Sequence, residues 1–380
     1  MEIALFFSPL KETFFSTPDN TLGGQVEAFV EEVPHWKDKD IVILGVPEYR
    51  GEETTSETRN DLAEIREAFY QQKNNFSQLK IADIGDLNLG LTLQDTYLRL
   101  EEVIANLIKE NCLPIILGGS HDLTYAQYMA YASLEKYVHL INIDARIDLD
   151  VAGTSLKKEA FLGELFTQKP NYLFGYSHVG YHSFLTDTEE LKLLEEVGFD
   201  CFRVGELKSN IHETEPIIRN GNLISIDIDS IRASDSPCSF SPFGFTAEEA
   251  CQMMWYAGHH EHMSSLGLYG YSSQKDIQKR SAKGYAAMLW YFIDGFYSRM
   301  GKATIFDSNY TKYIVPFESH TICFYKDNLS DKWWLEIESD EGANKLERNV
   351  LVPCSHTDYQ DATEGKLPDR WVQAFTRLSL

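Results

Sequence analysis

Short, continuously apolar runs alternate with longer amphipathic stretches along most of the chain, and this alternation constrains the fold more than any other feature. The stretches at 61–70 and 93–110 have helical periodicity. Strands that are apolar throughout and are separated by helices indicate a parallel sheet covered on both faces. The sequence therefore predicts a three-layer α/β/α fold around a mainly parallel sheet. The strands are expected at residues 41–46, 80–85, 113–117, 137–143 and 223–228.

The last part of the chain has a different character. We predict one α/β domain over residues 1–302 and a C-terminal extension over 303–380 that packs on it. The extension is distinguished by three tryptophans, a proline-bounded apolar run and a charged loop, at Trp333, Trp334, Trp371, 313–316 and 339–348.

Charge and composition narrow the class of protein. The 380 residues include 34 lysines and arginines against 58 aspartates and glutamates, a formal net charge of −24. This charge argues against nucleic acid and anionic membranes as partners. There is no convincing signal peptide and no apolar run near the ~18 residues of a membrane span. The six cysteines are scattered without a CxxC pair, so we expect free thiols and a cytoplasmic protein.

Three strand ends carry the residues that suggest chemistry. His121 follows two glycines after the run at 113–117, Asp144 and Asp148 follow the run at 137–143, and Asp227 and Asp229 end the run at 223–228. In extended chain, side chains two residues apart lie on one face, so Asp227 and Asp229 are expected to project together, as are residues 144, 146 and 148. Several carboxylates on buried strands need a cation. Oxygen ligands with one imidazole favour Mn²⁺, Mg²⁺ or Fe²⁺.

Each of these motifs also has an ordinary explanation. A GG-x-H sequence is often a plain glycine turn, a D-x-D pair is often a surface loop, and an aspartate at a strand end commonly caps the next helix. The order of all three motifs at the ends of apolar strands favours a joint site.

Taken together, the motifs resemble the ureohydrolase superfamily, which includes arginases, agmatinases and formimidoylglutamases. The order GG-x-H, D-A-x-x-D, S-x-D-x-D carries the resemblance, which extends from about residue 41 to 300 and includes Gly45-Val46-Pro47 and the strand end at 81–86. The long spacing from Ser225 to Pro237 is typical of the formimidoylglutamase branch.

The resemblance implies an arginase-like fold and a two-manganese site whose hydroxide attacks an amidine or guanidinium carbon. By motif position, one metal would be held by His121, Asp144, Asp148 and Asp227. The other would be held by Asp144, Asp227, Asp229 and residue 146. His121 and Asp229 are the expected catalytic residues, with Asp229 helping to position the hydroxide.

Residue 146 departs from the family pattern, because Arg146 stands where a histidine is expected. A guanidinium stays protonated and has no lone pair for a metal. We expect Arg146 to replace the second metal as a cation and to pair with Asp229 and Asp227. The alternative is that Arg146 turns to solvent. Either way the sequence predicts at most one tightly bound Mn²⁺, or none.

A second departure concerns the substrate. Where the family has a glutamate that grips the cationic amidine, this chain has Gly270. Ser120 and Asp122 also differ mildly from the usual motif, without an expected effect on metal binding. The loss of the substrate carboxylate places turnover in doubt.

Other candidates have plainer explanations. His259, His260 and His262 resemble a metal cluster, but their spacing does not converge well and a helix or loop surface is the better interpretation. His178 and His182 could move protons, yet packed or exposed histidines are more common. The pair Trp333-Trp334 is expected to bury the extension or an oligomer interface.

The sequence thus predicts a formimidoylglutamase-like hydrolase for a C–N bond in a small linear amidine or guanidino compound. The rival prediction is a catalytically silent homologue with a binding, regulatory or structural role, and Arg146 and Gly270 favour it. A third option is a one-metal hydrolase for a neutral substrate. The expected partners are a small molecule and further copies of the chain.

Overall fold

A ten-stranded sheet forms the centre of the molecule, in the order β1-β4-β3-β5-β10-β9-β6-β7-β8, with β2 also paired to β4. The computed structural model describes residues 3–15, 17–52, 61–150, 156–300, 309–317, 320–338 and 349–379. β1 pairs antiparallel with β4, and the other strand pairs of this sheet are parallel. The strands are β1 (Phe7–Ser8), β2 (Glu27–Ala28), β3 (Ile41–Val46), β4 (Ile81–Leu87), β5 (Leu113–Gly118), β6 (Val138–Ile143), β7 (Leu173–Tyr181), β8 (Asp200–Arg203), β9 (Leu223–Asp227) and β10 (Ser265–Tyr269).

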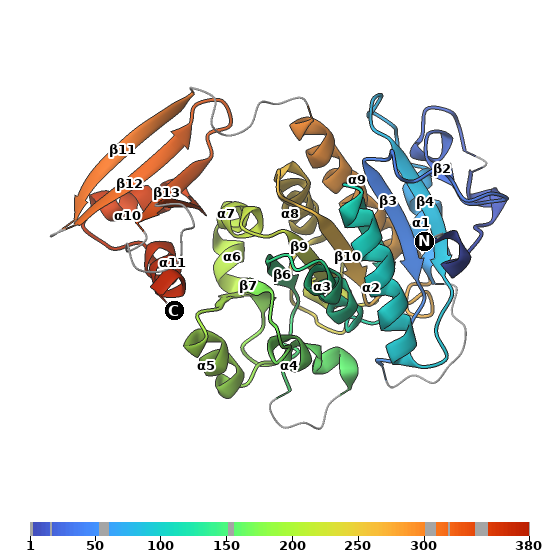
Figure 1. Ribbon diagram of the computed structural model, residues 1–380, viewed down its shortest axis with the longest axis horizontal. Helices are drawn as coiled ribbons and strands as arrows, with labels where there is room; N and C mark the ends of the chain where they lie inside the picture. Colours follow the sequence, from blue (N-terminus) through green and yellow to red (C-terminus); the bar gives the residue numbers. More distant parts are fainter. Residues whose placement is uncertain are drawn as a thin grey trace.

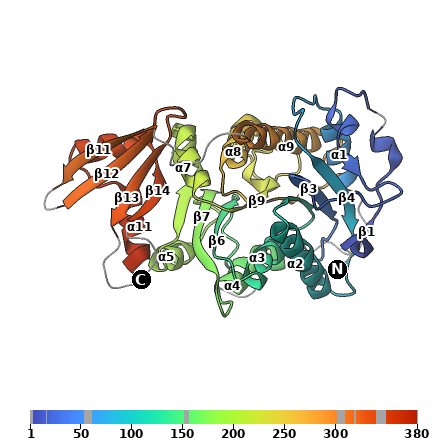
Figure 2. The same ribbon diagram turned by 45° about the horizontal axis from the view of Figure 1, so that its top comes forward.

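Helices cover both faces of this sheet, which confirms the predicted three-layer fold. In Figure 2, α1, α8 and α9 lie above the strands and α2, α3 and α4 lie below them. Two apolar clusters fill the two interfaces, one on each face of the sheet. The helices are α1 (Leu62–Tyr70), α2 (Leu93–Lys109), α3 (Leu123–Ser133), α4 (Phe161–Phe166), α5 (Thr188–Glu196), α6 (Val204–Ser209), α7 (Thr214–Arg219), α8 (Ala247–His259) and α9 (Arg280–Arg299).

The sequence explains where these elements form. The five strands β3, β5, β6, β9 and β10 are buried along their whole length, as their apolar runs require. Thr92 and Thr246 begin α2 and α8 with reciprocal capping boxes, which satisfy the free N–H groups of the first turn. The strands β3, β4, β5, β6 and β9 and the helices α1 and α2 lie where the sequence predicts them, whereas β10, between β5 and β9, was not predicted.

The C-terminal part forms a second, antiparallel sheet of four strands with its own apolar core. Figure 1 shows this sheet beside the α7 end of the main domain. The predicted run at 313–316 lies within β11, whereas the charged loop at 339–348 and the predicted boundary at 302/303 lie outside the described residues. The elements are β11 (Tyr310–Phe317), β12 (His320–Asp327), β13 (Trp333–Glu338), β14 (Asn349–Cys354), α10 (His356–Thr363) and α11 (Asp369–Ser379).

Two whole-chain expectations concern membranes and thiols. Within the described ranges, no helix is both long and apolar enough to span a membrane. All six cysteines are free thiols, and four of them are buried.

Candidate metal centre

Four polar side chains meet at the carboxyl ends of neighbouring strands. His121 comes from the loop between β5 and α3, Asp144 and Asp148 follow β6, and Asp227 ends β9. β6 and β9 are adjacent, and β10 separates β9 from β5. The parallel sheet therefore brings these four predicted residues together, although more than 100 residues separate His121 from Asp227 in sequence.

The imidazole of His121 is the centre of the group. Its Nδ1 lies 2.9 Å from Oδ2 of Asp148, 3.2 Å from Oδ2 of Asp144 and 3.8 Å from Oδ2 of Asp227. His121, Asp144 and Asp148 are the one set of three potential ligands within 4.8 Å of one another among the described residues. Such a set of oxygens and one imidazole suits Mn²⁺ or Mg²⁺.

Hydrogen bonds hold the other side of three of these groups. Nε2 of His121 lies 2.9 Å from the hydroxyl of Ser225. Oδ1 of Asp144 accepts from its neighbouring backbone N–H, that of Ala145, and Oδ1 of Asp227 accepts from the N–H of Asp229 at 2.7 Å. In each of these three side chains one nitrogen or oxygen is held by a hydrogen bond, so the second nitrogen or oxygen is directed toward the centre of the cluster.

The cluster gathers several carboxylates around one imidazole. Nδ1 of His121 and Oδ2 of Asp148 are buried, and their 2.9 Å contact does not have the geometry of a hydrogen bond. Burial and the charge of Asp144 raise the pKa of Asp148 well above its ordinary value, and burial with the charges of Asp144 and Asp229 does the same for Asp227. Burial alone would lower the pKa of His121, but its contacts with Asp144 and Asp148 raise it well above 6.5. These shifts show that the cluster favours added positive charge, whether as protons or as a cation.

Asp229 does not extend the strand as expected. The chain turns after Asp227 into a short 3₁₀ segment, Ile228–Ser230, because the carboxylate of Asp227 caps it. Oδ1 of Asp229 accepts a 3.0 Å hydrogen bond from the N–H of Phe240. Burial and the charge of Asp144 raise the pKa of Asp229 to about 6. Asp229 therefore lies beside His121, Asp144, Asp148 and Asp227, and it is less buried than they are.

The structure places Arg146 away from the cluster, contrary to the expectation. Its guanidinium donates to Glu159 at 2.9 Å and lies 4.4 Å from the ring centre of Phe240. Among the ion pairs of the described residues, Arg146 pairs with neither Asp229 nor Asp227. The reason is a bend after β6, which breaks the two-residue alternation on which the prediction depended.

A different cation faces the carboxylates, and sequence reasoning missed it. The charges of Glu52, Asp227 and Asp229 outweigh burial and raise the pKa of Lys158. The charge of Lys158 in turn opposes the rise in the pKa of Asp229. Lys158 lies in the 3₁₀ segment Lys157–Glu159, whose backbone is bound to the carbonyl of Gly51. A lone lysine in a loop gives no sequence signal, so only the fold could reveal it.

Gly270 lies directly after β10, at the same edge of the sheet. Its φ is +81°, a backbone conformation that residues with a side chain rarely adopt. A Cβ at this position would lie 2.8 Å from Oδ2 of Asp227. The backbone geometry therefore favours glycine at the position where the family pattern has a glutamate.

Two further groups support the histidine loop. Asp122 is fully buried and accepts hydrogen bonds from the hydroxyls of Ser120 and Tyr97. A Cβ on Gly119 would lie 2.1 Å from the carbonyl oxygen of Glu48, so only glycine permits this close packing. The unusual Ser120 and Asp122 thus stabilise the loop that carries His121.

His178 is a packed histidine, as the plainer interpretation predicted. It is fully buried, and its Nε2 donates to the backbone carbonyl of Asp144 at 3.0 Å. Burial lowers its pKa to about 4, so it is neutral at pH 7. His182 is also buried, and burial lowers its pKa. The structure supports a positioning role of His178 for the backbone of Asp144.

The remaining candidates lie elsewhere. His259 stacks on Trp255 and binds Ser298, and His260 is buried. They belong to no ligand group within the described ranges. Trp333 and Trp334 are buried between the C-terminal sheet and the main domain.

Comparisons with known proteins agree with this geometry. The sequence model of the arginase family matches residues 39–294. Mitochondrial guanidino acid hydrolase of Homo sapiens is 38% identical over 74 residues, which cover 19% of this chain and 21% of that protein. Mitochondrial agmatinase of Gallus gallus is 31% identical over 118 residues, which cover 29% of this chain and 35% of that protein. The chain thus spans only about a fifth to a third of the length of these curated relatives.

Solved structures are similar over a longer stretch. Formiminoglutamase of Trypanosoma cruzi with manganese has a TM-score of 0.63 and 21% identity, and the match covers 70% of this chain and 97% of that one. Formimidoylglutamase of Bacillus subtilis has a TM-score of 0.64 and 16% identity, with 75% of this chain and 96% of that one covered. At these identities the likeness shows the fold. With the family match over residues 39–294, the chain belongs to the arginase family.

Proposed function

We propose that this protein hydrolyses a C–N bond in a small linear amidine or guanidino compound, as a formimidoylglutamase-like ureohydrolase. The observation that carries the proposal is the buried set of carboxylates whose oxygens converge on Nδ1 of His121. The printed names of its relatives, which include formimidoylglutamases, agmatinases and guanidino acid hydrolases, support this class of substrate.

The donor set fits one metal ion. His121, Asp144, Asp148 and Asp227 would hold it, because each offers one atom to a common centre, and hydrogen bonds fix the other side of all but Asp148. When bound, Mn²⁺ supplies an activated water molecule and stabilisation of negative charge. The same residues do not complete a second site, since Arg146 faces Glu159 and Lys158 brings a positive charge toward Asp229.

We assign to Asp229 the role of positioning the nucleophilic water molecule and accepting a proton from it. Its carboxylate is fixed by the N–H of Phe240, and Asp229 is less buried than the four residues that would hold the metal. With a pKa of about 6, Asp229 is ionised at pH 7 and can accept a proton.

Gly270 favours a second candidate, a catalytically silent family member that keeps the fold for binding or regulation. The described residues after β10 offer no carboxylate at this position, so a cationic amidine has no counter-charge there. A one-metal hydrolase of a neutral substrate would tolerate this lack, and it is the third candidate.

Metal analysis and activity assays on the purified full chain separate these candidates. We expect one Mn²⁺ per chain and slow hydrolysis of formimidoylglutamate, arginine, agmatine or a guanidino acid. Asp148→Asn should abolish manganese binding and hydrolysis. Asp19→Asn, which changes an exposed aspartate, should leave manganese binding and hydrolysis unchanged. Bound manganese without turnover of any of these compounds supports the silent homologue, and two Mn²⁺ per chain contradicts the one-metal site.

A further inference from the structure

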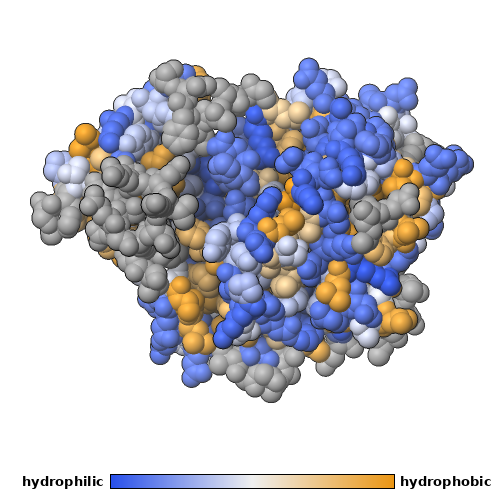
Figure 3. Space-filling model, viewed as in Figure 1, coloured by the Kyte–Doolittle hydropathy of each residue, from blue (hydrophilic) through white to orange (hydrophobic). Residues whose placement is uncertain are grey.

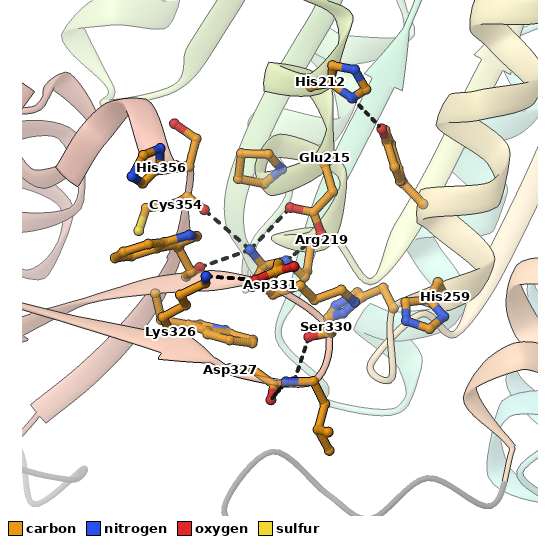
Figure 4. Close-up of a pocket in the computed structure, with 18 of the residues that line it drawn as sticks. His212, Glu215, Arg219, His259, Lys326, Asp327, Ser330, Asp331, Cys354 and His356 are labelled. Carbon is orange, nitrogen blue, oxygen red and sulfur yellow. Dashed lines mark hydrogen bonds and ion pairs between the residues drawn. The ribbon is translucent and has the colours of Figure 1, made fainter. Parts of the chain in front are cut away.

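A large cavity lies far from the carboxylate cluster, between the main domain and the C-terminal sheet. Its volume is about 1220 Å³, and none of His121, Asp144, Asp148, Asp227 and Asp229 lines it. Figure 3 shows the surface hollowed and hydrophilic between the two parts. In Figure 4, side chains from α7 and α8 and from the C-terminal strands point into the same space.

Aromatic rings form much of the cavity wall. Trp255 of α8 stacks on His259 with ring centres 4.8 Å apart, and Tyr310 and Trp333 line the opposite side on the C-terminal strands. His259 and Trp333 are residues that the sequence singled out and that the carboxylate site does not use. Flat aromatic surfaces of this kind favour a ligand with a planar group.

Three acidic side chains of the wall have close partners. Glu215 accepts from Arg219 at 2.8 Å, and Asp331 pairs with Lys326 at 2.7 Å. Asp327 accepts from the hydroxyl of Ser330 at 2.5 Å. Figure 4 shows these pairs along the cavity. They are therefore not free to attract a cation.

Two guanidinium groups of the same wall each have one nitrogen that lacks an acceptor. Nη1 of Arg219 and Nη1 of Arg299 are buried and have no hydrogen-bond partner in the described part of the chain. Arg219 otherwise binds Glu215 and two backbone carbonyls, but Arg299 contacts the ring of Phe296, at 4.3 Å, and no carboxylate bonds to it among the described residues. Burial lowers the pKa of Arg299 to about 10, and the charge of Glu261, which lines the same cavity, opposes this shift without an ion pair to Arg299 among the described residues.

We propose that this cavity binds a small organic anion with a planar aromatic group, whose carboxylate or phosphate pairs with Arg299. The aromatic wall would hold the ring, and the unpartnered guanidinium nitrogens would receive the anion. Because both the main domain and the C-terminal sheet contribute residues, the ligand would bridge the two parts.

Calorimetric titration of the full chain tests this proposal with defined probes. The probes are 1-naphthoate, 1-naphthyl phosphate, neutral 1-naphthamide, and acetate and inorganic phosphate, which lack a ring. One of the two aromatic anions should bind saturably, and at least about tenfold more tightly than naphthamide and than its ring-free counterpart. The better of the two aromatic anions identifies a carboxylate or a phosphate as the preferred group.

Variants then locate the anion. Arg299→Gln should weaken binding at least about tenfold, whereas Arg299→Lys, which keeps the charge, should stay within about threefold. Arg203→Gln, which changes an exposed arginine outside the cavity, should bind as the unaltered protein does. The proposal is overturned if neither aromatic anion binds saturably, if naphthamide binds equally well, or if a folded Arg299→Gln binds unchanged.

Discussion

At residue 270 the backbone has a φ of +81°, and the space for a side chain is filled by the carboxylate of Asp227. Gly270→Glu, which restores the family's residue type, should therefore lower the free energy of unfolding by about 1–3 kcal/mol. Its rate of arginine or agmatine hydrolysis should also be no higher than that of the unaltered protein. Urea unfolding and the hydrolase assay measure the two effects.

Gly284 provides the matched control for this substitution. It lies within α9 with no atom within 4 Å of an added Cβ and no left-handed φ. Gly284→Glu should leave stability unchanged or raise it by up to about 1 kcal/mol, because glutamate is the better helix former. Equal losses in the two variants would show that residue 270 has no special strain.

The charge next to the cluster gives a second prediction. Lys158→Gln should tighten Mn²⁺ binding about tenfold, or about 1.4 kcal/mol, because it removes a positive charge that interacts with Asp227 and Asp229. Arg146→Gln should change the affinity for Mn²⁺ less than about twofold, because Arg146 pairs with Glu159 and is more than a third exposed. Calorimetric titration with Mn²⁺ measures both. If Arg146→Gln has the larger effect, Arg146 and not Lys158 is the cation that faces the metal.

These residues also mark what the sequence could predict of the site. The motifs identified His121, Asp144, Asp148 and Asp227, because residues at the carboxyl ends of parallel strands converge whatever the details of the loops. They misplaced Arg146 and the turn at Asp229, because two-residue alternation ends where the strands end. Lys158 could not be predicted, since nothing local determines where a loop lysine points.

At the scale of elements, a buried ion pair ties α1 to β4. Arg66 is 1% exposed, and it donates to Asp83 at 2.8 Å and to Asp86 at 2.6 Å. The charges of Asp83 and Asp86 outweigh burial and raise the pKa of Arg66, so the guanidinium stays charged. Removing it would leave Asp83 buried without a counter-charge.

Arg66→Met should therefore lower the free energy of unfolding by about 3–5 kcal/mol. Arg99→Met is the control. Arg99, in the second turn of α2, binds only the backbone carbonyls of Asn88 and Leu89, so its loss should cost less than about 1 kcal/mol. Denaturant unfolding followed by circular dichroism compares them. Similar losses would mean that the α1–β4 pair contributes nothing beyond an ordinary surface contact.

The elements that the sequence predicted well are those whose local pattern matches their burial. β3, β5, β6 and β9 are apolar and buried throughout, so the pattern and the tertiary structure agree. Each C-terminal strand pairs with its neighbour in sequence, but polar and charged residues interrupt the apolar pattern, as in β11, where only one residue is buried. Their strand-like runs were visible, but the four-stranded sheet was not.

At the scale of the whole molecule, a small set of contacts holds the C-terminal sheet against the main domain. Arg219 of α7 donates to the carbonyls of Trp333 and Cys354. Glu213 accepts from Arg370 at 3.1 Å and from the hydroxyl of Thr357 at 2.9 Å. Because both sides of the cavity depend on this arrangement, its stability determines whether the cavity exists.

Glu213→Gln tests this docking without disturbing either core. Arg370 keeps its ion pair with Asp358 inside the C-terminal part, so that sheet should stay folded, while the contact between the two parts loses about 1–2 kcal/mol. Hydrogen exchange should accelerate in α7 and β14, where the two parts meet, and stay unchanged in β3 and β5. Glu206→Gln, which changes an exposed glutamate on α6, should leave exchange everywhere as it was. If exchange in α7 and β14 stays equally slow in Glu213→Gln, apolar packing and the carbonyl contacts of Arg219 are sufficient to hold the two parts together.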